Sequence, residues 1–193
     1  MRVVMISGRL PTPQTPGSMA PVARQAESLR RLGVEIDVLE LIGPRVIRYL
    51  LAALRLRRLA ARYDLIHAHF GMSGWVAMAQ RRRPSVVSFM GDDLLGRVGR
   101  DGVPTRFGRI AVHLNVRLAP RFDAVIVKSR EMADIVAPAA ADVIPNGVDL
   151  ATFRMRDGEA ARASLGWNDG RRRILFAGSR ATPCKRFPLA AAA

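Results

Sequence analysis

Candidate binding residues gather in short segments that each follow an apolar run of this 193-residue chain. A short apolar run bounded by turn residues is typical of a buried strand. Where such strands are parallel, open α/β sheets bind ligands beyond the carboxyl ends of the strands. Six segments therefore have the position to do chemistry: 8–18, 69–74, 90–105, 128–131, 146–153 and 178–186.

Two of these segments contain groups that suit a phosphate. Gly17 and Ser18 precede a helical pattern, and the N–H groups of a helix N-terminus bind phosphate oxygens. Capping of that helix by Ser18 is the simpler explanation of these two residues. Arg180 and Lys185 follow the apolar run ILFA together with Gly178. Because Arg forks onto phosphate oxygens and Lys adds a point charge, we expect a diphosphate clamp there rather than a solvated basic turn.

Histidines and aspartates follow two of the central apolar runs. His67 and His69 lie two residues apart on one expected strand, so their side chains point to the same side of the sheet. A metal pair lacks a third ligand nearby, so we favour histidines hydrogen-bonded to neighbouring backbone, with His69 the better candidate for meeting a ligand. Asp92 and Asp93 follow Gly91 at the next strand exit. We favour capping by these carboxylates over a divalent metal site.

Nucleophilic catalysis has no local signature in the chain. Ser129 opens a helical pattern with Glu131 close behind, which indicates an N-cap rather than a nucleophile. No Ser/His/Asp or Cys/His set has the spacing of a known nucleophile motif. We therefore predict no bound metal and no covalent cofactor, and leave the catalytic residues unassigned.

The stretch VIPNGVD at 143–149, with Phe153 after it, predicts a sharp exit from a strand. Proline presets φ before the turn, and Asn146-Gly147 is the pair best suited to positive φ. Asp149 and Phe153 then supply a carboxylate and an aromatic anchor. We interpret Asn146, Gly147 and Asp149 as a hinge between two domains.

The elements that position these residues alternate along the chain. Helix 44–63 begins with Pro44, which suits the first helical position. Alternating strands and helices predict an α/β fold, a Rossmann-like open parallel sheet, followed by the first strand and loop of a second such domain. The expected strands are 2–7, 34–41, 64–69, 84–91, 122–129, 141–145 and 171–179; the expected helices are 19–33, 44–63, 71–82, 106–122, 130–139 and 157–166.

The composition limits partners and location. A net charge of +15, from 31 basic and 16 acidic residues, favours anionic partners. The arginines of helix 44–63 fit either a helix packed on the sheet, which is the default, or a helix lying on a membrane surface. A lone Cys184 and the lack of a signal peptide or an apolar span predict a cytoplasmic protein, peripheral to the membrane if that helix binds it. Scattered positive charges without a recognition motif argue against a nucleic-acid binder.

In order along the chain, these loops resemble the glycosyltransferases of family 4, whose GT-B fold sets two Rossmann-like domains around a cleft. Four segments carry the resemblance, and IPNGVDLATF is the most specific. They are HAHFG (67–71), SFMGDDL (88–94), VIVKSREM (125–132) and IPNGVDLATF (144–153). A fifth, LFAGSRATPCKRFPLA (175–190), looks like the opening of the second domain.

The resemblance implies a retaining transfer of sugar from a nucleotide-sugar to a glycan or lipid-linked acceptor, with the nucleotide-sugar as co-substrate and no obligatory metal. It implies an acceptor-side domain over 1–157 and the start of a donor-side domain over 158–193. By position, Gly17, Arg180 and Lys185 match residues near the donor diphosphate. His69 and the 91–93 segment, Gly91, Asp92 and Asp93, would face the cleft.

The chain departs from the family pattern in two places. Met90 stands where the family often has a histidine, and Met cannot donate a hydrogen bond to a sugar hydroxyl. The family's Glu-x7-Glu segment would lie past Ala193. A lone strand and loop cannot bury a core, so we expect residues 158–193 to pack poorly and the chain alone to transfer no sugar. The alternatives are a non-catalytic module that binds an acceptor or an anionic membrane, and another GT-B enzyme such as a nucleotide-sugar epimerase.

Overall fold

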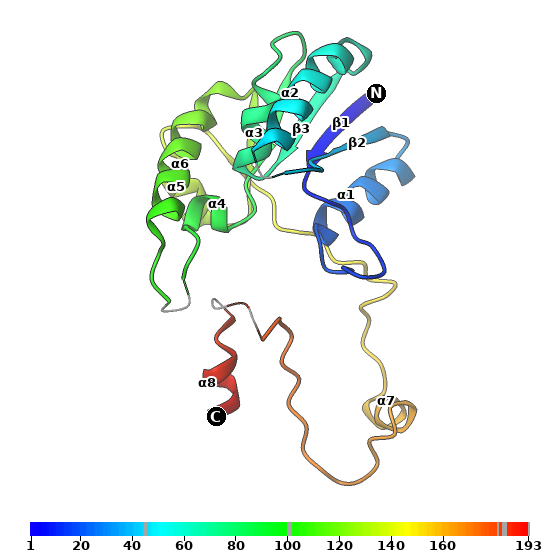
Figure 1. Ribbon diagram of the computed structural model, residues 1–193. Coiled ribbons are helices and arrows are strands. Elements are labelled where there is room, and N and C mark those ends of the chain that lie inside the picture. The colour runs from blue at the N-terminus through cyan, green and yellow to red at the C-terminus, as the bar shows by residue number, and fades with distance from the viewer. Residues whose placement is uncertain (45, 100–101, 181, 183–184, 193) are drawn as a thin grey trace. The chain divides into compact units, whose positions relative to one another are not determined.

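The computed structural model describes residues 1–44, 46–99, 102–180, 182 and 185–192 (Figure 1). Cys184, and Arg45 of the expected basic helix, lie outside the described residues. The chain divides into two compact units. Unit 1 comprises Met1–Val98 and Pro104–Asn146, and unit 2 comprises Gly99–Val103 and Gly147–Ala193.

Unit 1 is built on one parallel sheet of six strands in the order β2-β1-β3-β4-β5-β6. This confirms the Rossmann-like α/β fold, because only crossover connections join neighbouring parallel strands. The strands are β1 (Arg2–Ser7), β2 (Glu35–Glu40), β3 (Leu65–His69), β4 (Ser85–Ser88), β5 (Ala124–Val127) and β6 (Asp142–Val143).

The helices of unit 1 occupy the predicted helical segments with shorter bounds, except α4 (Asp92–Leu95), which lies in the segment 90–105 that we expected to be a loop. They are α1 (Ala20–Arg31), α2 (Ile47–Leu59), η1 (Ala60–Arg62), α3 (Gly71–Ala77), α4 (Asp92–Leu95), α5 (Arg106–Leu118), η2 (Ala119–Arg121) and α6 (Arg130–Val136). The expected role of Pro44 at the first position of its helix is wrong, because α2 begins only at Ile47. The Pro44 carbonyl instead accepts a hydrogen bond from the Arg48 N–H, 3.0 Å away.

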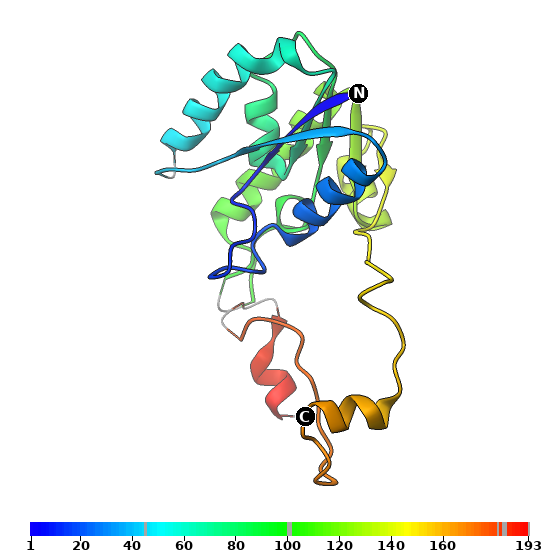
Figure 2. The ribbon, with the colours of Figure 1, turned by 90° about the vertical axis from the view of Figure 1, so that its right-hand side faces the viewer.

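Successive side chains of a strand point to opposite faces of the sheet, so the hydrophobic core is divided into two clusters, one on each face. Val4 and Ile6 belong to the larger cluster, which also contains Leu56 of α2 and Val76 of α3. The residues of β1 that point the other way, Val3 and Met5, pack with Val22 and Ala26 of α1 in a smaller cluster. Figure 2 shows α1 alone on one side of β1 and β2. His67 pairs in register with Met5, so its side chain lies on the α1 side.

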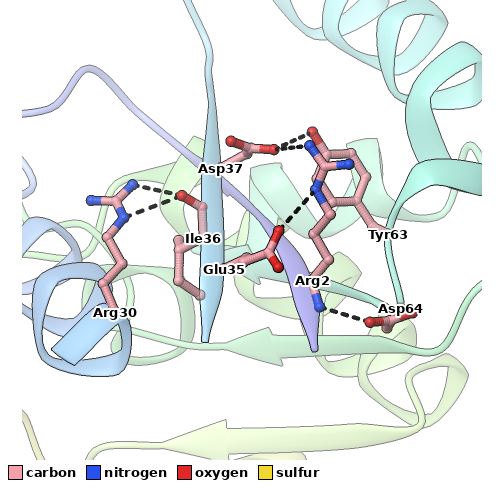
Figure 3. Close-up of polar contacts among 7 residues, drawn as sticks. All are labelled: Arg2, Arg30, Glu35, Ile36, Asp37, Tyr63 and Asp64. Atoms are coloured by element: carbon pink, nitrogen blue, oxygen red, sulfur yellow. Dashed lines mark hydrogen bonds and ion pairs between the residues drawn. The ribbon is translucent and has the colours of Figure 1, made fainter. Parts of the chain in front are cut away.

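The amino ends of the strands are joined by polar contacts (Figure 3). The Arg2 guanidinium contacts Glu35 at 3.6 Å and Asp37 at 3.4 Å, and the Arg2 N–H donates to Asp64 at 2.7 Å. The Tyr63 hydroxyl donates to Asp37 at 2.9 Å. These contacts join β1, β2 and the start of β3 at the edge opposite the candidate loops.

Unit 2 contains α7 (Gly158–Ser164) and α8 (Phe187–Ala192). The strand expected at 171–179 is wrong: no described residue of that segment lies in a strand. Ile174 and Leu175 are 91% and 84% exposed, and no described residue of unit 2 is buried. An isolated apolar run has no neighbouring strand to satisfy its backbone groups, so it stays unpaired.

Candidate functional site

The carboxyl ends of the strands in unit 1 meet at one edge of the sheet. His69 and Ser88 end the neighbouring strands β3 and β4 and pair in register. Lys128 follows β5, and Ser7 ends β1. The predicted ligand-binding segments 69–74 and 128–131, and the first residues of the predicted segment 90–105, therefore lie at this carboxyl edge.

The two histidines of β3 are buried against each other, with ring centroids 4.2 Å apart. The Ser88 hydroxyl lies 2.8 Å from Nε2 of His67. Neither ring nitrogen of His69 has a partner among the described residues. Burial lowers the pKa of His67 to about 4 and the pKa of His69 to about 2, so both imidazoles are neutral at physiological pH. The expected backbone partners are therefore wrong: His67 pairs with a side-chain hydroxyl, and both ring nitrogens of His69 lack a partner among the described residues.

A buried carboxylate joins the loops after β3 and β4. Asp93 accepts from the N–H groups of Gly91 at 2.8 Å, Met90 at 3.0 Å and Gly71 at 3.1 Å. Burial raises the pKa of Asp93, and these backbone hydrogen bonds oppose the rise. Asp93 closes the turn before α4, but the expected helix capping is wrong, because α4 has no side-chain cap and Asp92 is exposed. No cluster of three or more potential metal ligands occurs in the part of the chain that the structure describes.

Two glycines occupy positions in these loops that a residue with a side chain would not fit. Gly91 has φ of 141°, a conformation that L residues with a Cβ rarely adopt. A Cβ on Gly71 would overlap the side chain of Asn115 from α5. The buried Asn115 amide donates to the carbonyl of Asp93 at 3.0 Å. Sequence reasoning missed Asn115, because an Asn within an amphipathic helical pattern does not reveal its partner.

Lys128 is a second residue that sequence reasoning did not single out. It directly follows β5, and its Nζ donates to the Ile144 carbonyl at 3.2 Å. Burial lowers its pKa, and the charge of Asp93 opposes that effect. The charge of Lys128 in turn lowers the pKa of both His67 and His69. Its position one residue after an apolar run was the available signal.

Ser7 adds a further unsatisfied group at the carboxyl edge. Ile6 pairs with Ala68, so Ser7 and His69 occupy the next positions of two adjacent strands. The Ser7 hydroxyl is buried and has no hydrogen-bond partner in the described part of the chain. Buried polar groups are rarely left unpaired, since each costs about 1–3 kcal/mol. Ser7 and His69 together are therefore the strongest structural indication of a binding site.

Hydrogen bonds within the loop after β1, and from this loop to β2, hold the loop in place. The Leu10 N–H donates to the Glu40 carboxylate at 2.9 Å, and the Ser18 hydroxyl donates to the Arg9 carbonyl at 2.6 Å. The capping role considered for Ser18 is therefore wrong. The N-cap of α1 is Met19, at φ of 46° and with no side-chain cap. No atom lies within 4 Å of where a Cβ of Gly17 would be.

The expected turn at 146–149 differs in conformation from the prediction. Neither Asn146 nor Gly147 has positive φ, so the expected Asn-Gly turn is wrong. The Asp149 carboxylate organises the following turn instead, accepting from the Ala151 N–H at 3.0 Å and the Thr152 hydroxyl at 2.8 Å. Phe153 is 62% exposed, so the aromatic anchor expected at this position is wrong. The division between the two units falls between Asn146 and Gly147.

Arg180 and Lys185 both lie exposed in unit 2. The Arg180 guanidinium stacks over the Phe187 ring, 4.7 Å from its centroid. The Lys185 N–H donates to the Thr182 carbonyl at 3.0 Å. The role of both cations as diphosphate ligands stays a prediction.

The N-cap predicted at Ser129 in unit 1 is confirmed, because the Ser129 hydroxyl accepts from the Met132 N–H at 3.3 Å.

The carboxyl edge combines the neutral groups of Ser7, His67 and His69 with the buried carboxylate of Asp93 and the half-buried ammonium of Lys128. Neutral imidazole and hydroxyl groups both donate and accept, which suits the hydroxyls of a sugar or polyol. The sequence model of Glycosyltransferase Family 4 matches residues 12–152, which include this edge. The chain belongs to glycosyltransferase family 4.

Proteins with similar sequences include other glycosyltransferases. The chain is 33% identical over 129 residues to a D-inositol 3-phosphate glycosyltransferase of Kineococcus radiotolerans, a match that covers 60% of the chain and 29% of that protein. It is 31% identical over 126 residues to the same enzyme of a Nocardioides species, with 60% and 27% covered. The chain thus spans less than a third of these glycosyltransferases.

Solved structures share the fold. Sucrose-phosphate synthase of Thermosynechococcus elongatus matches with a TM-score of 0.62 at 18% identity, over 86% of the chain and 52% of that protein. Anabaena HepE in complex with UDP-glucose matches with a TM-score of 0.56 at 21% identity, over 87% and 50%. At such identities the likeness shows the fold alone.

Proposed function

We propose that unit 1 is the acceptor-side half of a sugar transferase that uses a nucleotide-sugar donor. The family match over 12–152 carries the proposal. The unpaired, buried Ser7 and His69 at the carboxyl edge support it, because a substrate hydroxyl would satisfy both. In the transfer, the acceptor oxygen bonds to the anomeric carbon as the nucleoside diphosphate leaves. This family membership disfavours a purely non-catalytic binding module.

We propose that the acceptor is a glycan or a lipid-linked molecule that meets His69, Gly91 and Asp93, with Asp92 at the rim. Asp93 is placed to hold the loops after β3 and β4 rather than to exchange a proton, since three N–H groups occupy its carboxylate. Small polyol phosphates belong in the test panel, because the relatives are D-inositol 3-phosphate glycosyltransferases.

The donor diphosphate would be held by Gly17 together with Arg180 and Lys185. The N-terminus of α1 close to Gly17 supports the first of these, because it has no side-chain cap and carries the positive end of the helix dipole, which attracts phosphate. Cations at the other two positions would stabilise the charge that grows on the leaving diphosphate. We propose no metal or organic cofactor in this step.

The domain organisation is part of the same proposal. Residues 1–157 would form the acceptor-side domain, 158–193 would begin the donor-side domain, and Asn146, Gly147 and Asp149 would form the hinge. The contact boundary between Asn146 and Gly147 supports the hinge position. The lone cysteine of the sequence fits a cytoplasmic location, and we propose peripheral contact with an anionic membrane there.

The test is to supply a complete donor half. Residues 1–146 would be fused to the donor-side half of the Kineococcus radiotolerans relative, and release of nucleoside diphosphate would be measured with UDP-glucose and a panel of polyol phosphates, glycans and lipid-linked sugars. The proposal predicts acceptor-dependent release that falls in a His69→Ala fusion. A folded fusion that binds UDP-glucose and transfers to no acceptor would contradict it.

We also propose that the 193-residue chain alone does not transfer sugar. Its two proposed diphosphate cations lie in a unit with no buried described residue, so that unit has no core to fix their positions. Measurable turnover of UDP-glucose by the purified chain would show this part of the proposal to be wrong.

A further inference from the structure

The solvent side of α2 combines exposed leucines with exposed arginines. Ala52 and Leu56 are buried against the sheet, and they lie one helical turn apart on one side of the helix. The opposite side carries Ile47, Leu50 and Leu54, which are 53%, 62% and 45% exposed. Figures 1 and 2 both show α2 at the outside of unit 1.

The apolar and basic residues are segregated along the helix. Ile47, Leu50, Leu51 and Leu54 have the spacing of one helical stripe and occupy the first two turns. The same stripe continues with Arg57 and Arg58 in the last turn, both exposed. This solvent side, residues Ile47, Leu50, Leu51, Leu54, Arg57 and Arg58, is called the α2 stripe below.

Further positive charge adjoins the carboxyl end of α2. Arg83 donates to the Ala61 carbonyl at 2.8 Å, which brings the exposed run Arg81–Arg83 beside the arginines of the helix. No acidic residue occurs from 41 to 63 or from 65 to 91. The charged residues of these two segments are therefore all basic, and the neighbouring carboxylates Asp37 and Asp64 both accept hydrogen bonds from Arg2.

We infer that the α2 stripe docks on an anionic lipid bilayer. The leucines would enter the boundary between headgroups and acyl chains, and the arginines would bind lipid phosphates. A second copy of this chain is a poor occupant, because both surfaces would carry positive charge. The stripe lies on a convex helix rather than in a groove, which suits a deformable lipid surface better than a protein partner. No described helix is long and apolar enough to cross a membrane.

The inference rests on unit 1 alone and does not require that the chain transfers sugar. It gives a surface and a partner to the membrane contact included in the proposed function. Lipid binding is measured without donor or acceptor, so failure of lipid binding and failure of sugar transfer are separate results.

The test is co-sedimentation of the 193-residue chain with vesicles. Vesicles of phosphatidylcholine alone would be compared with vesicles that also contain phosphatidylglycerol, at low and high salt. We expect binding only with phosphatidylglycerol, and weaker binding at high salt because exposed charges are screened. Leu51→Gln/Leu54→Gln and Arg57→Gln/Arg58→Gln should each lower the partition coefficient at least about tenfold.

Two matched variants on α5 and η2 control for general effects. Arg117→Gln/Arg121→Gln removes the same charge from exposed positions, and Phe107→Gln/Ile110→Gln removes exposed apolar side chains. Both controls should bind vesicles like the parent chain. Absence of binding, or equal losses in the control and α2 variants, would overturn the inference, as would binding to an acidic protein but not to vesicles. Circular dichroism would verify that each variant is folded.

Discussion

The buried histidine pair is the most pH-sensitive feature at the scale of single residues. The pKa of His67 is lowered to about 4 and that of His69 to about 2, chiefly by burial. An unfolded histidine titrates near pH 6.5, so below that pH the unfolded chain binds more protons than the folded chain. The contribution of the neutral histidines to the free energy of unfolding is therefore fully present above about pH 6.5. It is lost as the pH falls below that value, towards the lowered pKa of each histidine in the folded chain.

We predict that the free energy of unfolding falls by up to about 4 kcal/mol between about pH 7 and pH 5, at about 1.4 kcal/mol per pH unit for each histidine. Urea unfolding at several pH values measures it. His69→Leu should roughly halve this slope, whereas His113→Gln, at an exposed histidine of α5, is the matched control. An unchanged slope in His69→Leu would contradict the buried neutral pair.

Asp93 provides a second prediction at this scale. Asp93→Asn replaces one carboxylate oxygen with an NH2 group that faces backbone N–H donors, so hydrogen bonds to Gly71, Met90 or Gly91 are lost. Unpaired buried donors cost about 1–3 kcal/mol, and we expect a loss of stability of that size in urea unfolding. Asp92→Asn, at the exposed neighbour, should change little. Equal effects of the two variants would refute the role of Asp93.

At the scale of elements, the contact of α3 with α5 depends on Gly71. Gly71→Ala favours a helix by intrinsic propensity, but its Cβ would overlap Asn115. We predict a net loss of about 1–3 kcal/mol from overpacking, measured by urea unfolding. Asn115→Ala in the same chain should recover part of that loss. Gly17→Ala, with open space around it, should be nearly neutral; a comparable loss there would argue against the overlap as the cause.

The sequence predicted the six strands of unit 1 because each is an apolar run bounded by turn residues. The strand expected at 171–179 failed because pairing depends on neighbours that a local pattern does not reveal. The candidate site was predicted in part. His69 ends a strand, and Gly91 and Asp93 follow one, so these residues could be placed, whereas Asn115 reaches the site from within a helix. The unpaired state of Ser7 and His69 required three-dimensional packing.

At the scale of the whole molecule, the two units differ in how much they bury. Unit 1 contains every buried described residue, and unit 2 contains none. We predict that trypsin cleaves within residues 147–193 well before it cleaves unit 1, because cleavage needs a locally unfolded backbone. Mass spectrometry of a digestion time course would identify the cuts. Equal protection of both regions would contradict this prediction.

The central claim is that the carboxyl edge of the unit 1 sheet binds the substrates of a family 4 glycosyltransferase. Its most direct test is a ¹H–¹⁵N NMR titration of the 193-residue chain with UDP-glucose and with D-inositol 3-phosphate. The claim predicts shifts at Gly17, Gly71 and Gly91 and at the Lys128 amide, with the amino edge around Arg2 unchanged. Absence of shifts at millimolar ligand, or shifts confined to the amino edge, would contradict it.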